Sequence, residues 1–306
     1  VAATSGLAPP LSATLRMSLL AIFFFLWQLL SAGQRIFRLS GAGNNENPPA
    51  HKAELFAASR KKLVQMLRTE FALDRRNLLY LLLSGFCFGL YNLSYFYGLS
   101  VVFSNQGGIL TSVLVPIFSL LLYGYLHKTR LRCSQIVGLF MGLFGTLVLS
   151  GGLSSIFAAF SWDSAPHYWQ ISLFIITAFT WSCITQLSSK VQQYHSLQKY
   201  SFYAYFFAAL WTSWGWFWFT PEIQWLPLLG LIFVGSILGT SLYFLALRFL
   251  RPSYAASYLF LNPILIGFMG WWFLSEPWSL ELILGGLLAV LAIILLNKKL
   301  KSRITD

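Results

Sequence analysis

The feature that most constrains this chain is a series of apolar runs, each about 20 residues long and separated by polar segments. An α-helix of about 20 residues crosses roughly 30 Å of hydrocarbon. Of the 306 residues, 57% are hydrophobic and 10% are charged, against about 45–50% and about 25% in soluble domains. One water-soluble core could not bury this much apolar surface, so the sequence predicts an all-α polytopic membrane protein.

Nine spans are predicted, and the short connections between most of them make neighbouring helices antiparallel. The spans are Leu11–Ser31, Asn77–Gly98, Val102–Gly124, Cys133–Ser150, Tyr168–Ser188, Tyr200–Phe219, Trp225–Leu247, Ser253–Leu274 and Ser279–Leu296.

The basic residues predict the orientation of these spans. If the long loop at 33–76 faces the cytoplasm, 20 of the 21 Lys and Arg lie on the cytoplasmic side and only Arg16 does not. This asymmetry is typical of membrane proteins, and one missed helix would destroy it. Residues 298–306 then form a basic cytoplasmic tail. The net charge of +12 is therefore interpreted as topology, and no nucleic-acid partner is expected.

The long loop is a basic insertion within the first half. Its segment 53–76 places Phe56, Leu63, Leu67 and Phe71 on one helical face with Arg and Lys interleaved. Such a helix binds the surface of an anionic bilayer, and a solvated basic loop is the alternative.

A weak internal repeat divides the chain into residues 1–151 and 168–297. Pro116 and Pro263 are 147 residues apart, as are Gly138 and Gly285, while Gly142 and Gly145 have Ala at the matching positions. At an offset of 150, Gly85-x-x-x-Gly89 matches Gly235-x-x-x-Gly239. Small residues at these spacings let helices approach closely, so we expect a packing role for Gly85, Gly89, Gly138, Gly142, Gly235, Gly239 and Gly285. Chance similarity between apolar helices is the alternative.

The predicted topology gives the two repeats opposite orientations. Inverted repeats are common in secondary transporters, and their substrate sites lie between the halves. An inverted pair needs an odd number of helices in each half, and the first half shows four. We therefore expect a ten-helix (5+5) bundle whose first helix is absent from this chain.

Several short motifs occur in the two halves of the chain. They are Ala246-Leu247, Pro252 to Ala256, Leu261-Asn262-Pro263, Leu274 to Pro277, and Gly285, with Tyr97-Gly98-Leu99, Pro116, Gly138 and Leu15-Arg16 in the first half. Together they resemble the EamA branch of the drug/metabolite transporter superfamily. The resemblance implies a transporter. It does not select among amino acids, nucleobases, nucleotide sugars, organic phosphates and drugs. The family's Glu is present once, as Glu276, because Thr129 stands at the matching position of the first half.

Polar and aromatic side chains recur at helical spacing within the spans, and such groups tend to face a bundle interior or a wet cavity. We expect them to line a cavity suited to a small amphipathic or zwitterionic solute. The alternative is that each Ser or Thr bonds its own helix and each Tyr packs between helices. The candidates are Tyr91, Asn92, Tyr95, Asn105, Gln106, Trp181, Thr185, Thr240, Tyr243, Tyr258 and Asn262.

Arg16 is the one cation outside the cytoplasmic set. It is predicted either to bind a substrate carboxylate or phosphate or to reach the outer interface or Glu276 as a structural residue. Pro116 and Pro263 are candidate hinges for alternating access. No Asp or Glu lies at a mid-membrane position, which favours exchange or facilitated diffusion over proton coupling.

The chain has no Walker motif, no His-Glu-x-x-His and no Gly-x-Ser-x-Gly, so we expect neither an enzyme nor a cofactor or metal. The leading hypothesis is a secondary exporter or exchanger of small metabolites, with amino acids as the first guess. A sugar-phosphate or nucleotide-sugar carrier is the alternative, and a membrane scaffold or sensor is the hypothesis from another class. The expected location is the bacterial plasma membrane, and the oligomeric state is left open.

Overall fold

A computed structural model describes residues 7–41, 65, 71–72, 75–100, 104–149, 168–218, 225–262, 264–265, 268, 271–272 and 280–298. No strand occurs in these ranges, and every long stretch among them is helical. The prediction of an all-α polytopic membrane protein is confirmed. Most of segment 53–76, together with Pro263, Glu276 and the tail beyond residue 298, lies outside the described residues.

A helical segment corresponds to each predicted span. The first half contains α1 (Pro9–Gly41), α3 (Arg75–Leu99), α4 (Ser104–Leu126) and α5 (Cys133–Leu149). The second half contains α7 (Tyr168–Val191), α8 (Leu197–Thr212) with η3 (Ser213–Trp218), α9 (Trp225–Gly230) with η4 (Leu231–Thr240) and α10 (Ser241–Ala246), α11 (Pro252–Ser257) with η5 (Tyr258–Leu261), and α13 (Leu280–Asn297).

Three of the described helices are long and apolar enough to cross a membrane, at Pro9–Gln34, Asn77–Leu99 and Leu228–Ala246. Shorter apolar helices run over Leu110–Leu126, Cys133–Val148 and Ile283–Asn297. The clearest difference from the predicted boundaries is at the end of α1. The helix α1 continues to Gly41, beyond the predicted end at Ser31, so the first residues of the predicted insertion are helical.

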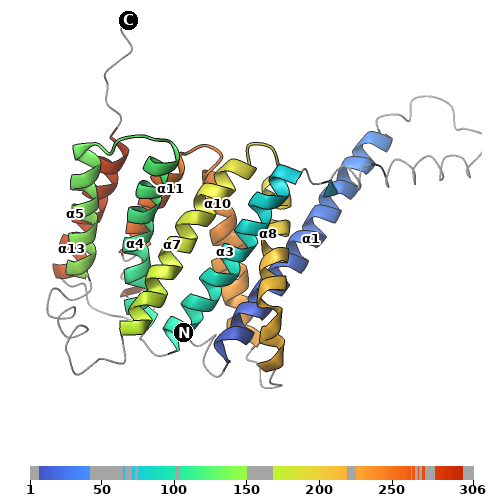
Figure 1. Ribbon diagram of the computed structural model, residues 1–306, viewed down its shortest axis with the longest axis horizontal. Coiled ribbons are helices and arrows are strands. Elements are labelled where there is room, and N and C mark those ends of the chain that lie inside the picture. The colour runs from blue at the N-terminus through green and yellow to red at the C-terminus, as the bar shows by residue number, and fades with distance from the viewer. Residues whose placement is uncertain are drawn as a thin grey trace, which may run out of the picture.

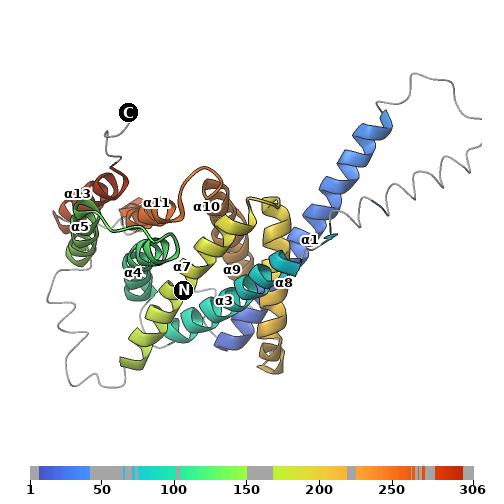
Figure 2. The same ribbon diagram turned by 45° about the horizontal axis from the view of Figure 1, so that its top comes forward.

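The helices stand side by side in one bundle, as Figures 1 and 2 show. At one end α5 packs along α13, and toward the other end α3 packs against both α7 and α8, while α1 packs against α8. The helix α4 lies between, against α7 and α11. Helices that match in the two proposed repeats, α5 with α13 and α1 with α8, therefore contact each other.

Close helix approaches occur where the sequence supplies glycine. A Cβ added to Gly85 would fall 2.4 Å from Phe207 Cβ of α8, and one on Gly138 would fall 3.1 Å from the Ala292 carbonyl of α13. The backbones can approach this closely because no side chain separates them. By contrast, Gly235 and Gly239 meet only atoms of their own helix among the described residues. The expected packing role is therefore not seen for this second pair.

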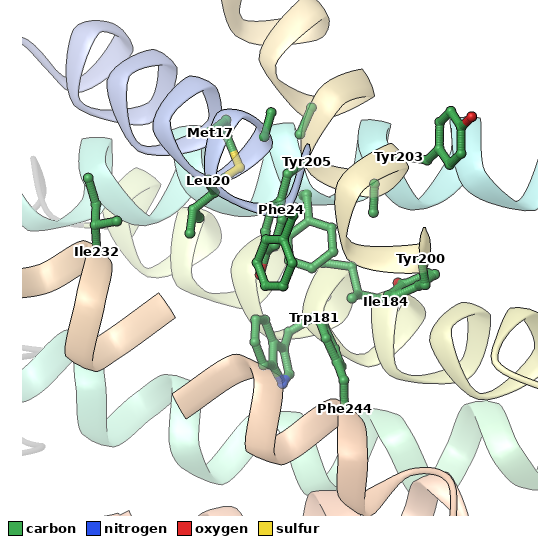
Figure 3. Packing of buried hydrophobic residues seen from close by; sticks show 14 of the residues in the cluster. Met17, Leu20, Phe24, Trp181, Ile184, Tyr200, Tyr203, Tyr205, Ile232 and Phe244 are labelled. Atoms are coloured by element: carbon green, nitrogen blue, oxygen red, sulfur yellow. The ribbon is translucent and has the colours of Figure 1, made fainter. Parts of the chain in front are cut away.

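The larger apolar core lies among α1, α3, α7, α8, η4 and α10, and it is rich in aromatic rings. Figure 3 shows Tyr205, Phe24, Trp181 and Phe244 within it. Phe24 and Tyr205 are stacked with ring centroids 5.5 Å apart. A smaller core joins α4, α5, η5 and α13. The candidate site lies between these two cores.

The segment η4 is π-helical over Leu231–Thr240. Its buried residues, with those of α9 and α10 on either side, recur every four positions: Leu228, Ile232, Ser236, Thr240 and Phe244. In a regular α-helix a four-residue step overshoots a full turn by about 40°, which would add up to about 160° along this stripe. A π-helix has wider turns, closed by i→i+5 hydrogen bonds. The π-helical segment thus keeps the stripe on the buried side.

Candidate functional site

A cavity of about 340 Å³ lies between the two halves of the chain. Pockets for small ligands are usually about 300–1,000 Å³, so this one suits a small solute. Its first-half wall comes from α3 and α4, and its second-half wall comes from α7 and the segment after α11. The lining residues are Tyr91, Tyr95, Thr111, Ser112, Val115, Trp181, Leu259, Asn262 and Leu265.

Aromatic rings form one side of the cavity. The rings of Tyr91 and Tyr95 are nearly parallel, at 7°, because these residues are four apart on α3. The Tyr91 ring also lies 4.9 Å from the Trp181 ring, centroid to centroid. The Trp181 indole reaches across from α7, so α3 and α7 build this surface together. Aromatic faces of this kind bind apolar groups and cations.

Polar groups from α4 and from Asn262, the residue after η5, form another side. Asn262 donates from Nδ2 to the Ser112 hydroxyl over 3.3 Å. Pro116 lies inside α4 and has no N–H, so the Ser112 carbonyl, four residues earlier, loses its usual helical donor. Farther along α4, Ser182 and Gln186 of α7 donate to the carbonyls of Val115 and Ser119. The cavity wall therefore carries hydrogen-bond acceptors without a described carboxylate.

Arg16 lies behind the aromatic wall and joins three helices. Its Nε donates to Ser236 Oγ of η4 at 2.8 Å, and its Nη1 donates to Asn92 Oδ1 of α3 at 3.1 Å. Arg16 is 8% exposed, Asn92 1% and Ser236 0%. The Asn92 amide is itself held, because its Nδ2 donates to the Phe88 carbonyl at 2.9 Å. No carboxylate pairs with Arg16 among the residues that the structure describes.

Two hydroxyl pairs extend this polar network into α8, η4 and α10. Tyr205 and Thr240 are 2.8 Å apart, oxygen to oxygen, and Thr240 donates to the Ser236 carbonyl. Thr185 lies 3.0 Å from the Tyr243 hydroxyl and also donates to the Trp181 carbonyl. The Trp181 Nε1 is buried and has no hydrogen-bond partner among the residues that the structure describes.

Beyond Trp181, aromatic rings fill the bundle. The Phe88 ring lies 5.9 Å from that of Phe244 and 6.3 Å from that of Trp181. Tyr200 packs edge-on against Phe244 at 5.4 Å. Figure 3 shows Trp181 and Phe244 facing each other at this point. These rings lie on the predicted cytoplasmic side of the cavity.

Not every predicted residue reaches the cavity. The structure places Tyr258 with 47% of its surface exposed, because the helix tightens into the 3₁₀ segment η5 at that residue and the α-helical spacing no longer applies. The side chains of Asn105 and Gln106 lie outside the described residues, although their backbone belongs to α4. Pro263 also lies outside them. Of the other candidates, Tyr91, Tyr95, Trp181 and Asn262 line the cavity.

Some residues at the site were not predicted from the sequence. Thr111, Val115, Leu259 and Leu265 line the cavity, but nothing in the pattern distinguishes them from lipid-facing residues. Tyr205 was also missed, because α8 carries several tyrosines and no spacing singles one out. Within the described residues, no three His, Cys, Asp or Glu side chains form a group that could hold a metal ion.

Comparisons with known proteins agree with this architecture. Residues 168–298 match the EamA-like transporter family. A protein of known crystal structure, 17% identical in sequence, superposes with a TM-score of 0.64 over 97% of this chain and 89% of its own. At this identity the likeness shows the fold alone. No curated protein matches the chain in sequence.

Proposed function

We propose that this chain, whose residues 168–298 match the EamA-like transporter family, is a secondary transporter acting by alternating access. It moves a small metabolite as an exporter or exchanger through the cavity between its two halves. The cavity is the observation that carries this proposal. Its walls come from both halves, so a relative movement of the halves opens and closes the binding site.

Amino acids are our first guess for the substrate. The aromatic faces of Tyr91 and Trp181 offer a surface for an apolar side chain or an ammonium group. The Ser112 carbonyl and the Asn262 amide offer acceptors for the ammonium group. A cavity of about 340 Å³ suits solutes of this size.

The packing of Phe88, Trp181 and Phe244 supports alternating access. These rings come from α3, α7 and α10 and contact one another. In our proposal they form the closed side of the pathway. Rotation of α10 against α3 and α7 would part them.

A sugar-phosphate or nucleotide-sugar carrier is the alternative. Phosphate groups call for several cations, and Arg16 is the one basic residue that the structure describes in the interior near the cavity. Lys190 lies near the Tyr80 ring and Arg251 near the Tyr254 ring, both at helix ends on the predicted cytoplasmic side. The charge distribution therefore favours a substrate with little negative charge.

Counterflow in proteoliposomes tests the proposal. Full-length protein is reconstituted with a mixture of amino acids inside, and uptake of each labelled amino acid is measured. Trp181→Leu is expected to lower saturable exchange at least tenfold, because it removes a wall of the cavity. Trp169→Leu is the matched control, since Trp169 lies on the same helix but is 50% exposed. Equal exchange by the two variants would contradict a role for the cavity.

The scaffold or sensor hypothesis makes an opposite prediction for the basic segment. A carrier should keep most of its exchange when residues 53–76 are deleted, whereas a scaffold acting through this segment should lose its activity. Absence of exchange of any amino acid or sugar phosphate by folded protein would remove the carrier proposal.

A further inference from the structure

Arg16 is a cation held deep in the bundle by neutral groups. Its described partners are a serine hydroxyl and an asparagine amide oxygen, at 2.8 and 3.1 Å. A charged side chain in a membrane interior is costly, and such residues usually mark a ligand or ion site. A residue needed only for packing could be apolar here, so the charge itself requires an explanation.

The two described hydrogen bonds of Arg16 use only part of its N–H donors. Arginine carries five N–H groups in a planar fork that fits a carboxylate. The hydrogen bonds to Ser236 and Asn92 use Nε and one N–H of Nη1. The Nη2 amino group donates to no described residue. Arg16 is 8% exposed, so the side chain is not sealed completely into protein.

Arg16 also lies next to the cavity wall. Asn92, its partner on α3, directly follows Tyr91, which lines the cavity. Tyr91 and Tyr95 of the same helix both line the cavity, and Asn92 Oδ1 lies 3.1 Å from Arg16 Nη1. A negative group that enters between these tyrosines would therefore come under the field of the guanidinium in a medium of low dielectric constant.

We infer that the transported solute carries a single carboxylate group and that Arg16 is the residue that recognises it. This inference rests on the proposed function and narrows it to monocarboxylates, with or without an amino group. One guanidinium neutralises one carboxylate, and the ammonium group of a solute that has one is left to the aromatic faces of the cavity wall. A phosphate dianion would leave a net negative charge beside Arg16, because the other buried cation that the structure describes, Lys199, lies in the first turn of α8 and donates to the Ala72 carbonyl.

Asn92 and Ser236 act as positioning residues in this arrangement. Asn92 belongs to the first half and Ser236 to the second, so both halves orient the guanidinium. The four-residue stripe of the π-helical segment brings Ser236 to the buried side. Loss of one neutral partner should loosen Arg16 but leave its charge, whereas loss of the charge should abolish carboxylate recognition.

The test compares binding of three probes of similar shape to the purified full chain in detergent. Isocaproate carries the carboxylate alone, leucinol carries the ammonium alone, and L-leucine carries both. A second series of 3-phenylpropionate, phenylalaninol and phenylalanine covers a larger body. Dissociation constants come from the shift of the thermal unfolding midpoint with probe concentration. Phenylphosphate against benzoate tests the charge of the anion.

We expect carboxylate probes to bind in at least one series and the matching alcohol not to bind. Arg16→Gln should weaken carboxylate binding about 30-fold, equivalent to ~2 kcal/mol. Arg16→Lys should retain part of it, and Ser236→Ala should stay within about threefold of wild type. The last two variants keep the charge, so they test the inference even if Arg16→Gln folds poorly.

Three results would overturn the inference: equal binding of isocaproate and leucinol, carboxylate binding that is unchanged in Arg16→Gln, or no carboxylate-dependent shift in either series. Phenylphosphate binding more tightly than benzoate would overturn the preference for a single charge. Counterflow separates these results from failure of the proposed function. A wild-type protein that exchanges neutral or phosphorylated solutes but no carboxylate remains a transporter with a different substrate.

Discussion

The hydroxyl oxygens of Ser94 and Thr177 lie 2.8 Å apart and join α3 of the first half to α7 of the second. Each hydroxyl also has an acceptor in its own helix, at the Leu90 and Leu173 carbonyls. Cross-helix hydrogen bonds in membrane proteins average about 0.6 kcal/mol, because each group finds other partners when the pair is broken. The pair therefore orients α3 on α7 more than it stabilises the contact.

A double-mutant cycle with Ser94→Ala and Thr177→Ala should give a coupling energy of about 0.6 kcal/mol for unfolding in detergent. Ser100→Ala combined with Thr177→Ala is the control, since the Ser100 hydroxyl donates to Tyr97 of its own helix. A coupling energy above about 2 kcal/mol would contradict the argument that each hydroxyl keeps a hydrogen-bond acceptor in its own helix when the pair is broken.

Gly142 of α5 faces the ring of Phe260, where an added Cβ would fall 2.5 Å from Phe260 Cζ. Gly142→Ala should lower the free energy of unfolding by about 1–3 kcal/mol, because the ring or the helix must move. Gly230→Ala is the matched control, since nothing lies within 4 Å of its added Cβ, and it should be neutral or stabilising. Phe260→Leu should recover part of the Gly142→Ala loss, and a lack of recovery would place the clash elsewhere.

Asn92→Asp would place a carboxylate beside Arg16, where Asn92 Oδ1 now lies 3.1 Å from Nη1. The internal ion pair should raise the free energy of unfolding by about 1 kcal/mol and compete with a bound carboxylate. We therefore expect a higher thermal unfolding midpoint together with loss of isocaproate binding. Asn92→Leu, which leaves Arg16 charged, should lower the midpoint and keep some binding. Retention of full isocaproate affinity in Asn92→Asp would contradict the role of Arg16.

The predicted orientation can be checked with thiol labelling. Cys133 is exposed at the start of α5, on the predicted cytoplasmic side. A membrane-impermeant maleimide should label it in inside-out vesicles but not in intact cells. Ser100→Cys, introduced with Cys133→Ser, should show the opposite pattern, because Ser100 is exposed at the other end of α3. Labelling of Cys133 in intact cells would reverse the assigned topology.

Apolar run length was sufficient to predict the helices, and the start of α5 agrees to the residue. The helix α5 begins at Cys133, as expected, because a span must start where polar loop residues give way to apolar ones. The helix α1 was predicted too short, since beyond Ser31 it becomes more polar while remaining helical. Hydropathy predicts which residues lie in the bilayer, but it does not predict where a helix ends.

The site was harder to predict than the helices. Lipid-facing and interior-facing positions are both apolar in a membrane bundle, so periodicity does not separate Tyr91, which lines the cavity, from Tyr258, which does not. The spacing argument also assumed regular α-helices. It failed at the 3₁₀ segment containing Tyr258, and it gave no sign of the π-helical segment, where the buried stripe repeats strictly every four residues.

The π-helical segment also sets the rotational phase between the two ends of its helix. If its i→i+5 hydrogen bonds changed to i→i+4, each residue would turn further about the axis, and Phe244 would swing around the helix relative to Ile232. The aromatic contact with Phe88 and Trp181 would then break, while the Arg16 partner Ser236 moved in the same event. A twist confined to ten residues could thus link the position of the Arg16 partner to the opening of the predicted cytoplasmic side, with no need for whole helices to tilt.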